Sequence, residues 1–324
     1  MDGTPDCMGT GDNTAGSNSE HAETSGTRKQ VGNFKILYLF GGPYRPSDGF
    51  EKFCQQLGSQ CEQIDIEFNP DHDLTSQSFW DHLSARLDDF DAYLISPPCS
   101  TFTAARNDED GGPGKLRSVE GPGRYGLGNL NPEDKHKVRI GTLLALRGHA
   151  VASHAQRSNK PWILEQPHMR EDGTSMFRLD EFQQLLQENG VRIFTFAQCR
   201  FGSDAEKLTD LMSNQDLDHM VLTCNHEPQI WIVPWNGRRY FLPHAPLRGR
   251  QRAIKARDWN SSMLRQYEPT GPYVTKAHAA YPAQLNRKLA LSLVESCLQH
   301  QSRPHPGSTV ALKMDQNLDT PKKQ

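Results

Sequence analysis

Short apolar runs alternate with helix-like stretches between about residues 34 and 214, and this alternation limits the folds that the chain can adopt. We predict buried strands at 35–40, 61–67, 91–96, 160–165, 191–196 and 208–213. We predict helices between them at 48–57, 78–87, 131–156 and 180–189. Strands that alternate with helices of this length favour a mostly parallel sheet covered on both faces, so the predicted fold class is α/β. Ligands of such sheets bind at the carboxyl ends of the strands.

The remaining segments differ from this core in composition. Residues 1–32 and 301–324 are polar and poor in large apolar side chains, so we expect both to be disordered tails. Residues 215–276 lack periodicity and are rich in Pro, Gly, Arg and aromatic side chains, which predicts a small irregular region. A closing helix is expected at 277–300, and together with 33–214 it would complete the core of the fold.

Positive charge is concentrated in one part of the chain. The formal net charge is −3, but residues 235–276 carry nine Lys and Arg against two acids. A patch of this kind can follow a phosphate backbone, although a solvated basic face is the plain alternative. The arginines that we select as candidate contacts to nucleic acid are Arg238, Arg239, Arg248, Arg250 and Arg252.

The cysteines and the hydropathy indicate the compartment. Seven cysteines occur at scattered spacings, and the first 30 residues contain no apolar segment typical of a secretory signal. We therefore expect a reduced, intracellular compartment. No apolar run approaches the roughly 20 residues that a membrane-spanning helix needs, so we expect no membrane association.

One cysteine stands where a nucleophile would stand. The segment Pro97-Pro98-Cys99 follows the apolar run 92–95, and Glu165 closes the next predicted strand along the chain. If the two runs are neighbouring strands, the thiol and the carboxyl lie side by side at the strand ends. A thiolate can attack C6 of a cytosine, and a carboxyl group can hold its ring nitrogen, which is the chemistry of C5 methylation. An inert buried thiol and a strand-end ion pair are the structural alternatives.

A second group of residues suggests an adenosine-type cofactor. Phe40-Gly41-Gly42 follows the first strand and precedes a helix, and small residues there allow the backbone to approach a ligand. Asp65 ends the next strand, where a ribose diol would be hydrogen-bonded, and Asp73-Leu74 could face an adenine. A plain turn and surface acids are the alternatives. The residues that we assign to cofactor binding are Phe40, Gly41, Gly42, Asp65, Asp73, Leu74 and Pro98.

Two further features surround Cys99 in the sequence. Seven glycines between 111 and 128 predict a loop that could act as a lid over the cysteine, with a disordered insertion as the alternative. Arg106 follows the cysteine closely and could reach a base or a phosphate.

Cys224, His226 and His244 are the residues that could suggest a metal site. Their spacing is not the pair of ligand pairs that is typical of zinc sites, so we predict no metal.

The order of these motifs resembles that of the C5-cytosine DNA methyltransferase family, and the resemblance covers about residues 34–293. The segments that carry it are Leu39-Phe40-Gly41-Gly42, Pro97-Pro98-Cys99, Glu165-Gln166-Pro167, Phe201-Gly202 through Lys207 and Thr209, and Ala279-Ala280-Tyr281-Pro282-Ala283-Gln284-Leu285.

This resemblance implies a class I S-adenosylmethionine-dependent methyltransferase fold with a Rossmann-like sheet and S-adenosylmethionine as cofactor. It also implies that Cys99 is the nucleophile, that Glu165 and Lys207 act at the base, and that the basic region recognises a DNA target. The sequence departs from the family where Gln-x-Arg-x-Arg is expected, because Ala205, Lys207 and Thr209 occupy those places.

Four functions fit the sequence. The first is a DNA cytosine C5 methyltransferase. The second is a catalytically inactive nucleic-acid-binding protein of a mobile element, and the third is an RNA cytosine methyltransferase. A dinucleotide oxidoreductase is the fourth, but no full G-x-G-x-x-G follows the first strand. We expect a monomer that is nuclear in a eukaryote and cytoplasmic otherwise.

Overall fold

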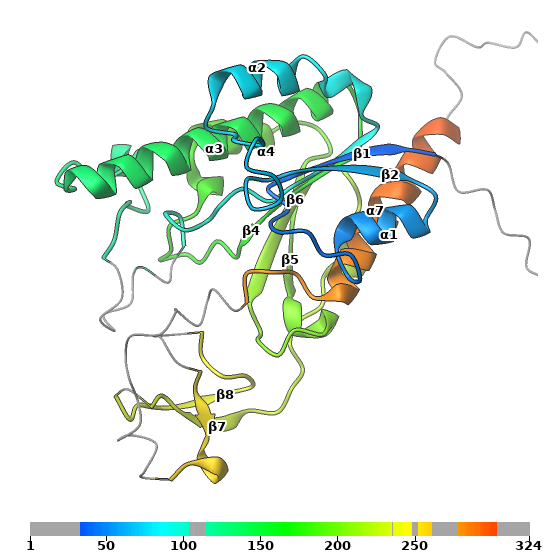
Figure 1. The fold of residues 1–324 in the computed structure, drawn as a ribbon. Coiled ribbons are helices and arrows are strands. Elements are labelled where there is room, and N and C mark those ends of the chain that lie inside the picture. Colours follow the sequence, from blue (N-terminus) through cyan, green and yellow to red (C-terminus); the bar gives the residue numbers. More distant parts are fainter. Residues whose placement is uncertain are drawn as a thin grey trace, which may run out of the picture. The chain divides into compact units, whose positions relative to one another are not determined.

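In the residues that the computed structural model describes, the strands form two β-sheets. One has six strands in the order β2-β1-β3-β4-β6-β5, and the other has three strands in the order β8-β7-β9 (Figure 1). The residues that the structure describes are 33–103, 106, 114–234, 236–247, 252–260 and 278–302.

The large sheet and its helices account for most of the elements. Its strands are β1 (Lys35–Leu39), β2 (Gln60–Ile64), β3 (Ala92–Ile95), β4 (Trp162–Pro167), β5 (Arg192–Ala197) and β6 (Leu208–Ser213). Its helices are α1 (Phe50–Gln56), α2 (Gln77–Ser84), α3 (Pro132–Arg157), α4 (Asp180–Leu186) and α7 (Ala283–Ser302). The small sheet consists of β7 (Gln229–Ile232), β8 (Arg239–Leu242) and β9 (Ile254–Lys255).

The large sheet is mainly parallel. Strand β1 pairs in parallel with β2 and β3, and β3 pairs in parallel with β4. Strand β6 lies between β4 and β5 and is antiparallel to both. The predicted α/β class with a Rossmann-like sheet is therefore confirmed.

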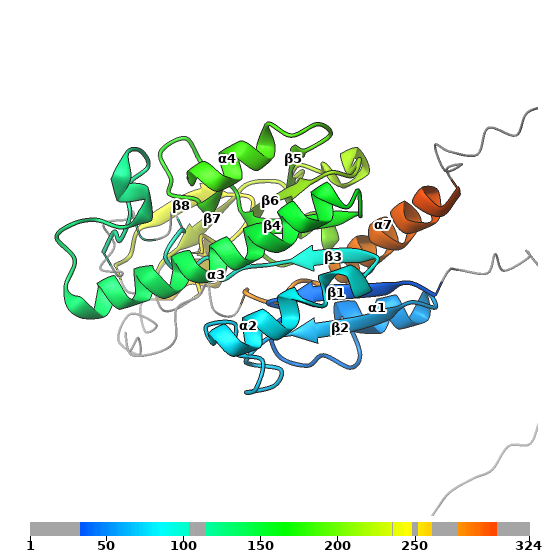
Figure 2. The ribbon, with the colours of Figure 1, turned by 90° about the horizontal axis from the view of Figure 1, so that it is seen from above.

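Helices cover both faces of this sheet, because its central strands are apolar on both sides. Leu37 of β1 and Tyr93 of β3 pack on the face that carries α2, α3 and α4. Ile36 and Leu94 point to the opposite face, which carries α1 and α7. Figure 1 shows α2 and α3 on one side of the strands and α1 and α7 on the other, and Figure 2 looks down onto the side that carries α2 and α3. Alternate residues thus build two separate cores, as expected for strands buried on both faces.

The register of the parallel strands sets the position of the functional edge. Leu39, the last residue of β1, lies opposite Ile64 and Ile95, the last residues of β2 and β3. Ile95 in turn lies opposite Leu164 in β4. The residues that follow these strand ends are therefore brought to one edge of the sheet.

The long helix α3 begins where the sequence predicts. The side chain of Asn131 accepts a hydrogen bond from the backbone N–H of Asp134 at 2.8 Å, and Pro132 occupies the first turn. Other element ends differ from the prediction. For example, α2 ends at Ser84, β2 at Ile64 and α4 at Leu186, whereas β4 continues to Pro167 and α7 to Ser302.

The region 215–276 is less irregular than predicted, because it contains the small antiparallel sheet. The turn between β7 and β8 is closed by a hydrogen bond from the N–H of Val233 to the carbonyl of Arg238 at 2.9 Å, and Gly237 adopts a φ of 66°. Its strands have only two to four residues, which is too short for a period-two pattern to be recognised.

Several predictions lie outside the described residues. These are the tail 1–32, the tail from 303 onward, and the segments 107–113 and 261–277. In the part of the chain that the structure describes, no helix has the length and apolar character needed to cross a membrane.

Candidate active site at the carboxyl edge of the sheet

Cys99 lies on a loop that is clamped between two neighbouring elements. The amide of Gln166 in β4 donates a hydrogen bond to the carbonyl of Pro97 at 2.9 Å. On the other side, a Cβ added to Gly148 of α3 would lie 2.8 Å from the ring of Pro97, so only glycine fits there. The Cys99 thiol is free and half-buried. The loop therefore presents the thiol from a fixed position.

Glu165 comes from the adjacent strand β4 and is 7% exposed. Its carboxyl group has Tyr281 as a hydrogen-bond partner, and the Tyr281 hydroxyl also lies 2.8 Å from the hydroxyl of Ser96. Burial raises the pKa of Glu165 above its ordinary value, although Lys207 and the hydrogen bond with Tyr281 act against that rise. The carboxyl group is thus biased toward its protonated form.

Lys207 completes this group from the loop before β6. It adopts a φ of 31°, and its ammonium group donates a hydrogen bond to the carbonyl of His278 at 3.0 Å. Its charge lowers the pKa of both Cys99 and Glu165. The structure therefore brings together the three residues that the sequence analysis selected for catalysis.

The environment of Cys99 works against a resting thiolate. Burial, and after it the nearby Glu165 carboxyl, raise the pKa of the thiol to about 11, although Lys207 acts to lower it. The thiol is consequently protonated near neutral pH. Attack by this sulfur requires its proton to leave when a substrate is in place.

Arg117 supports the cysteine loop and was not singled out as a positioning residue by the sequence. It is 2% exposed, and its guanidinium lies 3.7 Å from the centre of the Phe102 ring. It donates hydrogen bonds to the Thr101 hydroxyl at 3.1 Å and to the Val138 carbonyl at 3.0 Å. It thereby ties the turn that follows Cys99 to helix α3.

This anchoring changes the interpretation of the glycine-rich segment as a lid. Besides the buried Arg117, Arg124 forms an ion pair with Asp180 at 2.8 Å. Both arginines of the segment are therefore bound to the core, and the part 114–128 is a packed loop. The part 107–113 lies outside the described residues.

The glycine loop after β1 offers open space at one position. Gly42 adopts a φ of 73°, and a Cβ added there would meet no atom within 4 Å, whereas one added to Gly41 would lie 2.6 Å from the Gln63 side chain. Phe40 also has a positive φ, of 61°. Asp65 accepts a hydrogen bond from the N–H of Gly42 at 2.9 Å and so fixes the turn. A ligand can approach the backbone at Gly42 but not at Gly41.

The predicted cofactor residues Asp73 and Leu74 differ in their surroundings. Leu74 is 4% exposed and packs in the core, so its side chain is not available to a ligand. Asp73 accepts two hydrogen bonds from Thr75, from its N–H and its hydroxyl, and these lower its pKa. In contrast, Ile66 and Phe68, which follow Asp65, are 56% and 36% exposed. The sequence analysis missed both, although apolar residues after a strand-end acid are a visible signal.

The arginines predicted to contact nucleic acid lie in different surroundings. Arg106 donates hydrogen bonds to the carbonyls of Ser100 at 2.7 Å and Gly114 at 3.2 Å, next to the cysteine loop. Arg238 and Arg239 are exposed at the turn into β8. Arg252 pairs with Asp204. Arg248 and Arg250 lie outside the described residues.

Replacing Arg117 tests its positioning role. Arg117→Ala would remove the buried donor of the hydrogen bonds to the Thr101 hydroxyl, the Val138 carbonyl and the Thr142 hydroxyl. We expect the free energy of unfolding to fall by about 2–4 kcal/mol in urea titrations. Arg139→Ala, an exposed change on the same helix α3, should alter it by less than about 0.5 kcal/mol. Equal effects of the two changes would contradict the role.

The charges around Cys99 predict how fast it reacts. Glu165→Gln removes a group that raises the pKa of the thiol, and Lys207→Met removes one that lowers it. At pH 8–9 the first change should therefore speed alkylation of Cys99 by iodoacetamide and the second should slow it. Each unit of pKa changes the thiolate fraction about tenfold in this range.

Peptide-resolved mass spectrometry would report the reaction of Cys99 separately from the other cysteines. Lys288→Met, an exposed change on α7, serves as the control and should leave the rate unchanged. The electrostatic description is wrong if Glu165→Gln and Lys207→Met shift the rate in the same direction.

Comparisons with known proteins show a distant similarity to a solved structure. No protein-family model matches the chain, and a search of curated proteins finds no match. Among solved structures, the chain is similar to the crystal structure of the S. pombe Dnmt2 methyltransferase, with a TM-score of 0.32 and 14% sequence identity. The alignment covers 56% of this chain and 50% of that chain, so it spans half of the relative's length.

Proposed function

We propose that the protein transfers a methyl group from S-adenosylmethionine to C5 of cytosine in DNA, through a covalent bond between Cys99 and the base. The observation that carries this proposal is the electrostatic interaction of a thiol on the loop after β3 with a buried carboxyl group of raised pKa on the neighbouring parallel strand β4. Lys207 acts on both groups, and Arg117 and Gln166 hold the loop that bears the thiol.

The reaction follows from the properties of this pair. The Cys99 sulfur, once deprotonated, forms a bond to C6, and the electron pair of the C5–C6 double bond makes C5 nucleophilic. Glu165 holds a proton at N3 and so offsets the charge that develops in the ring. After C5 has been methylated, loss of its proton restores the double bond and expels the Cys99 sulfur.

The edge of the sheet also fits the cofactor. The open backbone at Gly42 leaves room beside the loop, and Asp65 stands at the end of β2. The exposed side chains of Ile66 and Phe68 offer an apolar surface for an adenine ring. S-adenosylmethionine, when bound, supplies the methyl group. We propose Gly42, Asp65, Ile66 and Phe68 as the residues that hold it.

The positions that depart from the family pattern have structural roles instead of contacts to a base. Ala205 is 2% exposed, and Thr209 is fully buried. The Thr209 hydroxyl accepts a hydrogen bond from Gln198 at 3.0 Å and donates one to the carbonyl of Lys207 at 3.0 Å. These contacts hold the strained backbone of Lys207 in place. Of the three residues at the motif positions, Lys207 is the one that carries a charge.

DNA is the substrate that the sequence resemblance implies, and the exposed Arg238 and Arg239 could contact its phosphates. Cys99 and Glu165 would contact the cytosine base and not the sugar, so their chemistry does not distinguish DNA from RNA. A test of the proposal therefore has to include RNA.

Transfer of a labelled methyl group tests the activity. We expect the wild-type protein to convert cytosine to 5-methylcytosine in DNA incubated with labelled S-adenosylmethionine, as measured by mass spectrometry of the nucleosides. Cys99→Ala should reduce transfer to background, and Glu165→Gln should slow it by about 10²- to 10⁴-fold. Label in RNA alone would contradict the proposed substrate. No transfer to either nucleic acid, with binding intact, would favour an inactive binding protein.

A change at the glycine loop tests the cofactor site. Gly42→Val fills the space beside the loop and strains a residue with φ of 73°. We expect it to weaken S-adenosylmethionine binding at least tenfold, or about 1.4 kcal/mol, in calorimetry. Gly190→Val is the matched control, because Gly190 also has a positive φ, of 82°, and open space, but it follows α4. Similar losses of binding in both variants would contradict the assignment.

A further inference from the structure

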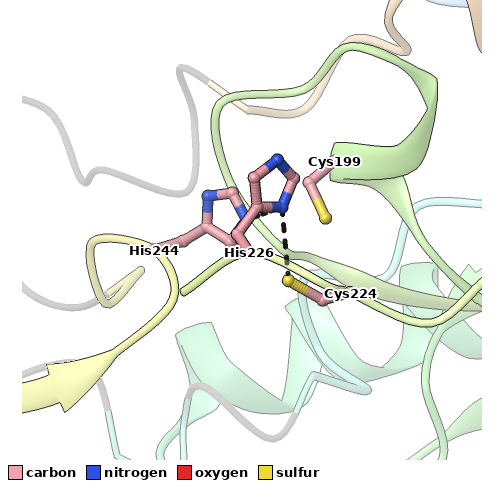
Figure 3. Close-up of side chains that lie close together, drawn as sticks. All are labelled: Cys199, Cys224, His226 and His244. Atoms are coloured by element: carbon pink, nitrogen blue, oxygen red, sulfur yellow. Dashed lines mark hydrogen bonds between the residues drawn. The ribbon is translucent and has the colours of Figure 1, made fainter. Parts of the chain in front are cut away.

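Two cysteines and two histidines meet away from the candidate active site. The side chains of Cys199, Cys224, His226 and His244 converge as Figure 3 shows, and their potential ligand atoms all lie within 4.8 Å of one another. The four residues include two thiols and two imidazoles, which is one of the common donor sets of structural zinc sites.

Three separate segments supply these side chains. Cys199 belongs to the short helix η5 (Gln198–Phe201), which directly follows β5. Cys224 and His226 lie in the segment before β7, and His244 follows β8. A hydrogen bond of 2.9 Å from the N–H of Ala197 to the carbonyl of Leu222 holds the first two segments together.

The distances fit a tetrahedral site. The Cys224 sulfur lies 3.5 Å from Nδ1 of His226, and that nitrogen lies 3.2 Å from Nε2 of His244. Zinc bonds of about 2.3 Å to sulfur and about 2.0–2.1 Å to nitrogen place tetrahedral ligands roughly 3.3–3.8 Å apart. The pairs in the structure are therefore already close to the spacing that one ion would impose.

The orientation of His244 adds a second, independent feature. Its Nδ1 lies 3.0 Å from the backbone carbonyl of Asp204, which can accept its proton in a hydrogen bond. In that tautomer the lone pair of Nε2 points to the other three side chains. Zinc-bound histidines commonly have their second nitrogen fixed by a carbonyl or carboxylate in this way.

We propose that Cys199, Cys224, His226 and His244 bind one zinc ion, which joins the small sheet to the end of β5 in the large sheet. Four protein ligands fill a tetrahedral coordination sphere and leave no position for a substrate, so the role is structural. The two thiols lose their protons to solvent as the ion binds. The site contains none of the residues proposed for methyl transfer, so the test of zinc binding does not depend on that activity.

The sequence pattern alone does not predict this site, because the fourth ligand is distant. Cys224 and His226 are separated by a single residue, which is not a usual ligand pair, and Cys199 precedes them in a different element. Only the fold of β5 against the segment before β7 brings Cys199 to the other three residues. The prediction of no metal is the one that this proposal replaces.

The metal content of the purified chain tests the proposal. We expect about one zinc per chain, by elemental mass spectrometry, in protein prepared under reducing conditions without a histidine tag. Cys224→Ser and His244→Asn should lose the metal. The matched controls are Cys61→Ser, at a cysteine outside the cluster, and His136→Asn, at an exposed histidine on α3, and both should retain it.

Cobalt substitution provides a measurement that does not depend on the folding of a variant. The wild-type protein loaded with Co²⁺ should show the visible bands of a tetrahedral ion and the sulfur-to-cobalt charge-transfer band of thiolate ligands. The proposal is overturned if these bands are absent or if wild-type protein holds no more zinc than Cys224→Ser. A disulfide between Cys199 and Cys224 in protein kept under reducing conditions would also overturn it.

Discussion

The hydrogen-bonded pairing of β1, β3 and β4 is the constraint on which the rest of the structure depends. Because these strands run in parallel and the last residues of β1 and β3 lie opposite each other and opposite Leu164 of β4, the glycine loop, the cysteine loop and Glu165 meet at one edge of the sheet. Slipping β4 by one residue against β3 would turn Glu165 to the other face and separate it from Cys99. The two cores on either face of the sheet hold the register in place.

The same burial has opposite consequences for the two reactive groups. It raises the pKa of Glu165, which favours the protonated carboxyl that can interact with a ring nitrogen. It also raises the pKa of Cys99, which disfavours the thiolate that must attack the ring. Lys207 lowers the pKa of both groups, so its charge favours the Cys99 thiolate but disfavours the protonated form of Glu165. The balance suits a site in which the thiol is activated only once a base has entered.

Much of the fold and the pairing of Cys99 with Glu165 can be predicted from the sequence, and the reason is local. Fully buried strands appear as continuous apolar runs, and the residue after each run marks a strand end. The contacts that support the site are different, because they join distant parts of the chain. Tyr281 lies 185 positions from its partner Ser96, and Arg117 contacts α3 from within a glycine-rich segment. Leu74, predicted at the cofactor, instead packs in the core, since nothing local distinguishes the two environments.

Covalent trapping tests the central claim most directly. DNA that contains 5-fluorocytosine blocks the last step of the proposed reaction, because fluorine at C5 cannot leave as a proton does. With S-adenosylmethionine, the wild-type protein should form an adduct that survives denaturing electrophoresis and maps to Cys99, and Cys99→Ala should form none. An adduct that persists in Cys99→Ala would contradict the account, as would its absence from wild-type protein that binds both DNA and cofactor.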